Sequence, residues 1–269
     1  MTLRLKPASA RRILRTRPFF VGLSEPSPWT GYLRYFERNQ SAPVPTLHDL
    51  RDLRISWSAE LGRSLGIFRL GETGEGRIAH EIESADYFPV DPVYSSALKL
   101  FVAEEGKHAA ILGNMLRELR QRPVEQNWTY RLFFVARRAI GLRVKLMVLL
   151  AAEIIGCECY GLLARALPSN SAGAALADIQ KEEKVHLGFH CHFFYLLGRN
   201  ILSKTLWRVM YETIANAACI SVLIDHRRTF RKMGVGYGKV IERFLRRITQ
   251  GRQLLRNGCP HPAIAEAIL

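Results

Sequence analysis

The chain has 269 residues, a formal net charge of +15 and 48% hydrophobic residues. That apolar fraction is ample for a buried core and argues against a disordered chain. Five cysteines, an odd number without a framework spacing, argue against a disulfide scaffold and suit core thiols in a reducing compartment. The arginine-rich first 24 residues contain no apolar signal core. We therefore expect a cytoplasmic protein with a basic N-terminal tail, although that stretch also resembles an organellar presequence.

Proline and glycine divide the chain into helical segments. We expect residues 1–69 to form a basic tail and wrapping helices, with an amphipathic stretch at 29–37 and a helix at about 47–66. Residues 70–197 form the core, and proline cannot continue a helix, so breaks are expected at Pro89 and Pro92. The expected core helices cover residues 71–88, 92–120, 130–167 with a kink at Gly141, and 172–197.

The C-terminal part, residues 198–269, is strongly basic. Between Arg199 and Arg256 there are 13 basic residues and three acidic ones, and helices are expected at 200–233 and 236–257. A surface with this excess of positive charge attracts nucleic acid, anionic lipid or an acidic redox protein. The alternative is a solvated basic face without a dedicated partner. No transmembrane helix is predicted, because charged residues interrupt the most apolar run, 146–167.

Two Glu-x-x-His clusters lie 78 residues apart, and each has a lone glutamate 30 residues upstream. Positions i and i+3 share one face of a helix, so each cluster can present two ligands to one metal. The doubled spacing predicts a repeated half-site on four antiparallel helices. Its six members are Glu75, Glu105, His108, Glu153, Glu183 and His186.

The position of the connecting turns favours Glu75 among the first-helix glutamates. Glu75 and Glu105 each lie 15 residues from the expected turn near residue 90, whereas Glu81 misses that level by roughly 9 Å. Glu72, on the same face as Glu75, is the main competitor, and Glu83 is a weaker one. The same reasoning places Glu153 and Glu183 at equal distances from a turn near Pro168.

Carboxylates mixed with two imidazoles suit a pair of iron or manganese ions. With these motifs, residues 70–197 resemble the ferritin-like di-iron carboxylate superfamily, and Gly71–Arg77 resembles the first-helix segment of uncharacterised bacterial members. The resemblance implies an all-α ferritin-like four-helix bundle with additional N-terminal and C-terminal helices. It also implies that the six residues above bind two iron ions, with Glu105 and Glu183 bridging them and dioxygen as co-substrate.

Further residues near these motifs are candidate site residues. The resemblance suggests that Glu104 and Glu182 hydrogen-bond the opposite histidine, although both could instead be exposed neighbours. His190 is one turn from His186 and is either an extra ligand or a polar core residue. Tyr160, two turns from Glu153, is either a redox relay, a substrate contact or a packed core tyrosine. Gly106 and Gly156 flank ligands and either leave room for substrate or allow close helix packing.

The leading functional hypothesis is an oxidoreductase that activates dioxygen to hydroxylate or oxidise a small organic substrate. Its electrons must come from an external donor, because the sequence has no flavin, nicotinamide or iron–sulfur signature. Alternatives are a di-iron hydroxylase acting on a polyanion such as tRNA, a ferroxidase or iron-binding protein, and a non-catalytic helical binding protein. A homodimer is a further expectation.

Overall fold

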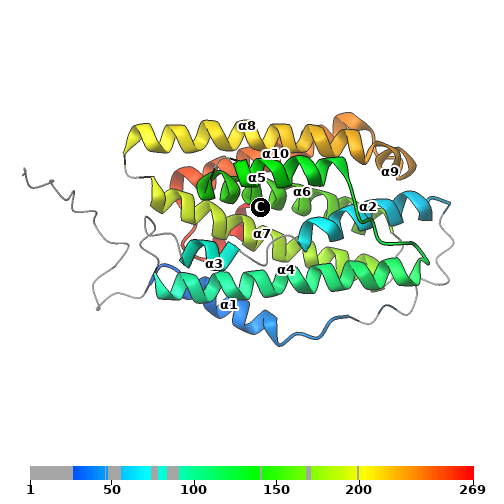
Figure 1. Ribbon diagram of the computed structural model, residues 1–269, viewed down its shortest axis with the longest axis horizontal. Helices are drawn as coiled ribbons and strands as arrows, with labels where there is room; N and C mark the ends of the chain where they lie inside the picture. The colour runs from blue at the N-terminus through cyan, green and yellow to red at the C-terminus, as the bar shows by residue number, and fades with distance from the viewer. Residues whose placement is uncertain are drawn as a thin grey trace, which may run out of the picture.

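The computed structural model is all-helical in the part of the chain that it describes, with eleven helices and no strand (Figure 1). The described residues are 27–45, 47, 56–73, 78–83, 91–139, 141–167, 171–198 and 200–269. The helices are α1 (Thr30–Gln40), α2 (Ser58–Glu72), α3 (Ile78–Glu83), α4 (Pro92–Glu118), α5 (Trp128–Ala139), α6 (Leu142–Ala166), α7 (Ser171–Leu197), α8 (Ile201–Asp225), α9 (Arg227–Lys232), α10 (Tyr237–Asn257) and α11 (Pro262–Ile268).

Two antiparallel helix pairs form the centre of the molecule. In the first pair, α6 packs along α7, with Gly161 beside Gln180. In the second, α2 packs along α4, with Gly113 beside Arg69. Helices α4 and α7 join the pairs, α1 covers α4, and α8 and α10 cover α6 (Figure 1).

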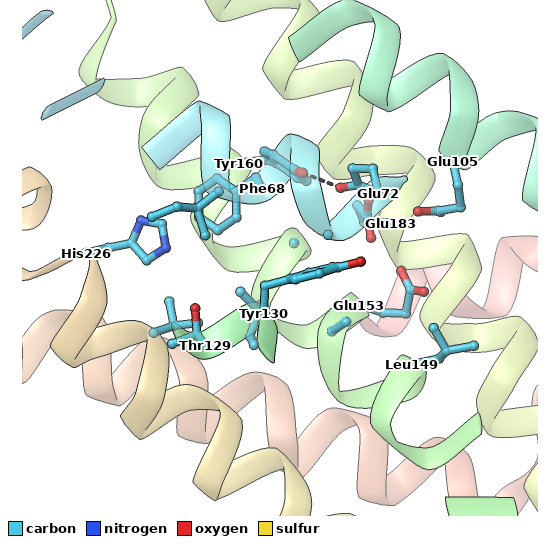
Figure 2. Close-up of a pocket in the computed structure, with 16 residues that line it drawn as sticks. Phe68, Glu72, Glu105, Thr129, Tyr130, Leu149, Glu153, Tyr160, Glu183 and His226 are labelled. Atoms are coloured by element: carbon cyan, nitrogen blue, oxygen red, sulfur yellow. Dashed lines mark hydrogen bonds between the residues drawn. The ribbon is translucent and has the colours of Figure 1, made fainter. Parts of the chain in front are cut away.

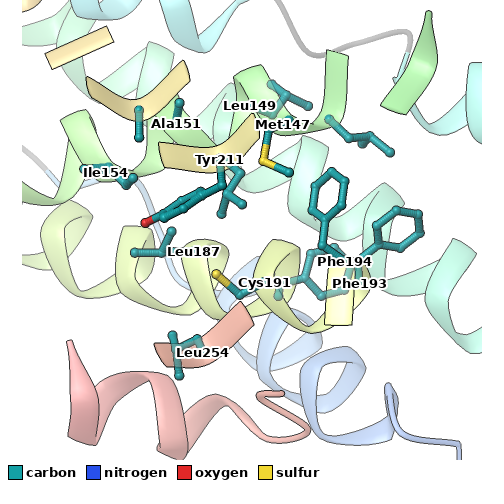
Figure 3. Close-up of a cluster of buried hydrophobic side chains, with 14 of the residues drawn as sticks. Met147, Leu149, Ala151, Ile154, Leu187, Cys191, Phe193, Phe194, Tyr211 and Leu254 are labelled. Carbon is teal, nitrogen blue, oxygen red and sulfur yellow. The ribbon is translucent and has the colours of Figure 1, made fainter. Parts of the chain in front are cut away.

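The apolar core lies between α6, α7, α8 and α10. Figure 3 shows Met147 and Ile154 of α6 on the side of Leu187 and Cys191 of α7, and all four are buried. This burial along both central helices fixes how α6 faces α7, because each apolar side chain removed from water stabilises the fold by about 1.5–3 kcal/mol. All five cysteines of the chain are buried and free, which confirms that they are core thiols.

A buried ion pair ties α10 to α6. Arg247 donates hydrogen bonds to Glu158 from both Nε and Nη2, at 2.8 and 2.6 Å, and Arg243 adds a third at 2.7 Å. Glu158 and Arg247 are both almost fully buried. These charge-assisted hydrogen bonds satisfy both buried groups and fix the position of α10 on α6.

Four expected helices differ from those observed. The helix expected over 200–233 is two helices, α8 and α9, which meet at His226. Of the helix expected over 71–88, the structure describes α3, Ile78–Glu83, while residues 74–77 and 84–88 lie outside the described residues. The helix expected over 47–66 is α2, which begins at Ser58, buries Leu61 and Leu65 beside α4 and runs on to Glu72. The expected boundary at residue 69 therefore falls inside α2. The long helix expected over 130–167 is two helices, because Gly141 has a φ of 88°, a left-handed conformation that ends helical geometry. The short helix α11 was not expected.

Other boundaries agree with the sequence. The amphipathic stretch near Trp29 is α1, and α4 begins after Asp91, whose carboxylate accepts a hydrogen bond from the Val93 amide at 2.7 Å. Helix α7 covers nearly the expected residues.

Helix α6 is long and apolar enough to cross a membrane, by length and composition alone. In the structure, however, 94% of its most apolar 18-residue segment is buried inside the protein.

Candidate metal centre

Four residues of the two Glu-x-x-His clusters meet at the interface of α4 and α7. One ligand atom from each of Glu105, His108, Glu183 and His186 lies within 4.8 Å of the others, and all four residues are buried. The inward atom of each imidazole is Nδ1. It lies 3.2 Å from Glu183 Oε1 in His108 and 2.8 Å from Glu105 Oε1 in His186. Each histidine therefore faces the carboxylate of the opposite helix.

The outward nitrogen of each imidazole is held by the acid next to the opposite cluster. His108 Nε2 donates to Glu182 at 2.7 Å, and His186 Nε2 donates to Glu104 at 2.8 Å. Because an ionised carboxylate only accepts, these bonds place the proton on Nε2 and leave a lone pair on Nδ1 in the neutral ring. The structure thus puts Glu104 and Glu182 beside the opposite histidines rather than in solvent. Such partners orient imidazoles for metal binding.

Glu153 and Glu72 supply two further carboxylates. Oε2 of Glu153, on α6, lies 3.6 Å from His186 Nδ1. Glu153 and Glu183 both line a cavity that adjoins the carboxylates and is described below. Glu72, at the end of α2, also lines that cavity and accepts a hydrogen bond from the Tyr160 hydroxyl. Glu75, the first-helix glutamate expected from the sequence, lies outside the described residues. Of its competitors, Glu72 lies beside the other carboxylates, while Glu81 pairs with Lys145 at 2.6 Å.

His190 is fully buried one turn beyond His186. Its Nε2 lies 3.7 Å from Glu153 Oε1, and Phe101 packs edge-on against both histidine rings. Burial, and then the neighbouring His186, lower the pKa of His190 to about 3, so its ring is neutral. A neutral imidazole at the rim of the carboxylate group retains a free lone pair.

Crowding of the carboxylates perturbs their protonation. Loss of solvent and the charges of Glu105 and Glu183 raise the pKa of both Glu72 and Glu153 well above the usual value. Burial alone would lower the pKa of His108, but hydrogen bonds to Glu182 and Glu183 raise it to about 10. Bound cations would offset the repulsion among the carboxylates, and their binding would release protons from the imidazoles.

The residues present fit a metal centre because their inward atoms have no other partner. Apart from contacts within this group of carboxylates and imidazoles, no hydrogen bond reaches Oε1 of Glu105 or Glu183, Nδ1 of His108 or His186, or either ring nitrogen of His190. Buried polar atoms without partners are rare in folded proteins, since each costs about 1–3 kcal/mol. Their convergence on one point, from oxygen and imidazole donors, is the pattern of a metal site.

A cavity of about 100 Å³ adjoins the carboxylates (Figure 2). Glu72, Glu105, Glu153 and Glu183 line one side of it. Most of the rest is lined by apolar and aromatic side chains, namely Ile67, Phe68, Tyr130, Leu149, Ile155, Tyr160 and Val222, and Thr129 and His226 complete the wall. The cavity can hold several waters or a small organic molecule.

The two glycines beside the ligands differ in their surroundings. A Cβ on Gly156 would lie 2.8 Å from Glu183 Oε2, whereas a Cβ on Gly106 would meet nothing within 4 Å. The position of the Glu183 carboxylate therefore requires a small residue at 156, whereas no neighbour requires one at 106.

Sequence reasoning missed two residues near the centre. Asn39 of α1 donates a hydrogen bond to Glu104 at 2.9 Å, and so supports the acid that holds His186. In Figure 2 the ring of Tyr130 extends from α5 towards Glu153 and Glu183. Neither residue belongs to the repeated motif, and no local pattern distinguishes them from other polar residues of α1 and α5. Only the packing of those helices against the centre shows them.

No protein-family model, no curated protein and no solved structure matches the chain.

Proposed function

We propose that the protein is a ferritin-like di-metal carboxylate oxidoreductase, in which α2, α4, α6 and α7 form the four-helix bundle. Two iron ions, or manganese in their place, would be held by Glu72, Glu105, His108, Glu153, Glu183 and His186. When bound, such a pair supplies one-electron redox chemistry and a binding site for dioxygen. The substrate is a small organic molecule, and an external donor supplies electrons.

One observation carries this proposal. Two imidazoles present their Nδ1 atoms to two carboxylate oxygens 3.2 and 2.8 Å away inside one buried group, and no residue outside that group satisfies these atoms. A structural core would not gather several carboxylates around two imidazoles in this way, because the desolvation cost and the repulsion among the carboxylates would not be offset. A pair of cations offsets it.

The other residues have separate roles in this proposal. Glu104 and Glu182 orient His186 and His108 and keep the proton on Nε2. Phe101, packed against His186, limits the access of water from one side. The cavity beside the carboxylates positions the substrate, whose apolar surface packs against Phe68 and Leu149.

The test is metal content and oxygen use by the full chain. After anaerobic loading with ferrous iron, we expect about two metals per chain and oxygen-dependent changes in optical and Mössbauer spectra. Glu105→Ala and Glu183→Ala should abolish binding of the pair. Asp178→Asn, which changes an exposed carboxylate on α7, is the matched control and should bind normally.

Three outcomes would contradict the proposal. Full metal occupancy in Glu105→Ala and Glu183→Ala would show that the ligands are elsewhere. Absence of bound metal, with melting unchanged by ferrous iron, would indicate a non-catalytic helical protein. Oxygen use that stops once ferrous iron is exhausted, and that an added reductant does not restore, would indicate a ferroxidase.

A further inference from the structure

Helix α8 is apolar on both of its faces. Its inner face buries Trp207, Tyr211 and Ala215. Its outer face carries a stripe of aliphatic side chains, each between 48% and 79% exposed, at Leu202, Leu206, Val209, Ile220 and Ile224. These positions recur at helical spacing along a helix about 37 Å long, with Thr213 and Ala217 between them. We call these seven residues the α8 stripe.

The α8 stripe carries no charge. The charged residues within the helix lie off the stripe; they are Lys204, Arg208, Glu212 and the buried Asp225. An exposed apolar strip of this length marks a contact with another apolar phase, because water contact along it is unfavourable. Helix α8 lies at the outer edge of the molecule in Figure 1, so the stripe is directed outward.

Cationic side chains gather at both ends of the α8 stripe. At one end, Arg227 and Arg228 line a hollow together with Ile224 and the exposed Trp128 of α5. Three more charged residues line this hollow, namely Glu60 and the ion pair of Arg63 with Asp225, so that the basic residues outnumber the acidic ones by three to two. At the other end, four cations line a groove between α8 and α10 beside Ile201; they are Lys204, Arg208, Arg252 and Arg256. An apolar stripe between basic ends, with an exposed tryptophan, is the pattern of a helix that lies in the interface of an anionic bilayer.

Helix α5 extends this surface and links it to the cavity. Trp128, Leu132 and Val135 are exposed at helical spacing on α5, which packs against α8. Other residues of α5 and α8, among them Tyr130 and Val222, line the cavity beside the candidate metal centre. The surface and the wall of the cavity are therefore built from the same pair of helices.

We propose that the α8 stripe, with the exposed side chains of α5, docks the protein on an anionic lipid bilayer. Charge favours this occupant over a second copy, because the chain carries a net charge of +15 and two copies would repel each other. The aliphatic stripe favours lipid over nucleic acid, whose phosphates would contact only the basic ends. The proposal does not depend on the metal centre.

The test uses the full chain and vesicle flotation. The protein should float with vesicles of phosphatidylcholine and phosphatidylglycerol, and much less with phosphatidylcholine alone. The double variant Leu206→Glu and Val209→Glu should lower binding about tenfold or more, because it places two carboxylates in the stripe. Arg227→Gln with Arg228→Gln should weaken binding only to the anionic vesicles.

Val44→Glu is the matched control. Val44 is also an exposed aliphatic residue, but it follows α1, on the opposite side of the molecule from α8 in Figure 1. It should bind vesicles like the wild type. Circular dichroism and melting verify the fold of each variant, and Ile220→Gln provides a milder change that should also weaken binding.

Four results would overturn the proposal. The wild type could fail to float with anionic vesicles. The stripe variants could bind as tightly as the wild type. A dimer that the double variant dissociates, without vesicle binding, would make the stripe a contact between copies. Binding of tRNA without vesicle binding would assign the basic groove to nucleic acid.

Discussion

His108 on α4 donates from Nε2 to the Glu182 carboxylate on α7 at 2.7 Å, and His186 on α7 makes the same bond to Glu104 on α4 at 2.8 Å. Each helix therefore contributes a buried histidine and also the acid that orients the histidine of the other helix. The adjacent acids Glu104–Glu105 and Glu182–Glu183 separate these two tasks, because consecutive helical residues point about 100° apart.

Glu182→Gln should weaken metal binding about 10–100-fold without abolishing it, because the amide no longer fixes the proton on His108 Nε2. Competition with a chelator measures the affinity. Asp178→Asn, on the same helix but exposed, is the control. An unchanged affinity in Glu182→Gln would mean that this hydrogen bond does not orient a ligand.

Substitutions of Glu72 and Glu75, the two candidates for the first-helix ligand, should affect the metal content differently. The structure places Glu72 at the centre, so Glu72→Ala should reduce the metal content from about two to about one per chain, and Glu75→Ala should leave it unchanged. Metal analysis after ferrous loading decides between them. Loss of a metal in Glu75→Ala alone would restore the assignment expected from the sequence.

Gly156→Ala should lower metal affinity about tenfold while leaving the fold intact. The new methyl group would displace the Glu183 carboxylate, although alanine favours a helix over glycine by about 0.5–1 kcal/mol. Gly106→Ala, which meets no neighbour, should bind metal normally. Equal affinities in the two variants would show that Glu183 does not need the space beside Gly156.

The buried ion pair between Glu158 and Arg247 should be costly to break. Glu158→Gln leaves the Arg247 charge buried without its partner and should lower the free energy of unfolding by about 3–5 kcal/mol. Glu242→Gln, which removes an exposed ion pair of the same helix α10, should cost less than about 1 kcal/mol. Urea unfolding of both variants measures the difference, and similar losses would argue against a buried charge.

His226 should make stability depend on pH. Burial, assisted by Arg63 and opposed by Asp225, lowers the pKa of His226 to about 4, and the ring stacks on Phe68 at 4.5 Å. The unfolded chain, with a pKa of about 6.5, then binds the proton more tightly than the folded protein. His226 therefore contributes fully to the free energy of unfolding above about pH 6.5, and this contribution is lost as the pH falls towards 4. The loss is about 2 kcal/mol at about pH 5.

The measurement for His226 is urea unfolding of the wild type and of His226→Gln across this pH range. The wild type should lose more stability on acidification than the variant does. Parallel curves for the two proteins would show that the folded protein accommodates the charged imidazole.

The sequence determined the helical class and the four members of the buried Glu/His group, Glu105, His108, Glu183 and His186. Local geometry alone puts Glu105 with His108, and Glu183 with His186, on common faces, and the cap at Asp91 that starts α4 is equally local. Tertiary packing decided the rest. Glu72 reaches the centre because α2 lies along α4, and Asn39 and Tyr130 approach it because α1 and α5 cover the central helices. Spacing along one helix follows from its own backbone, whereas the register and contact faces of separate helices depend on how their side chains fit together.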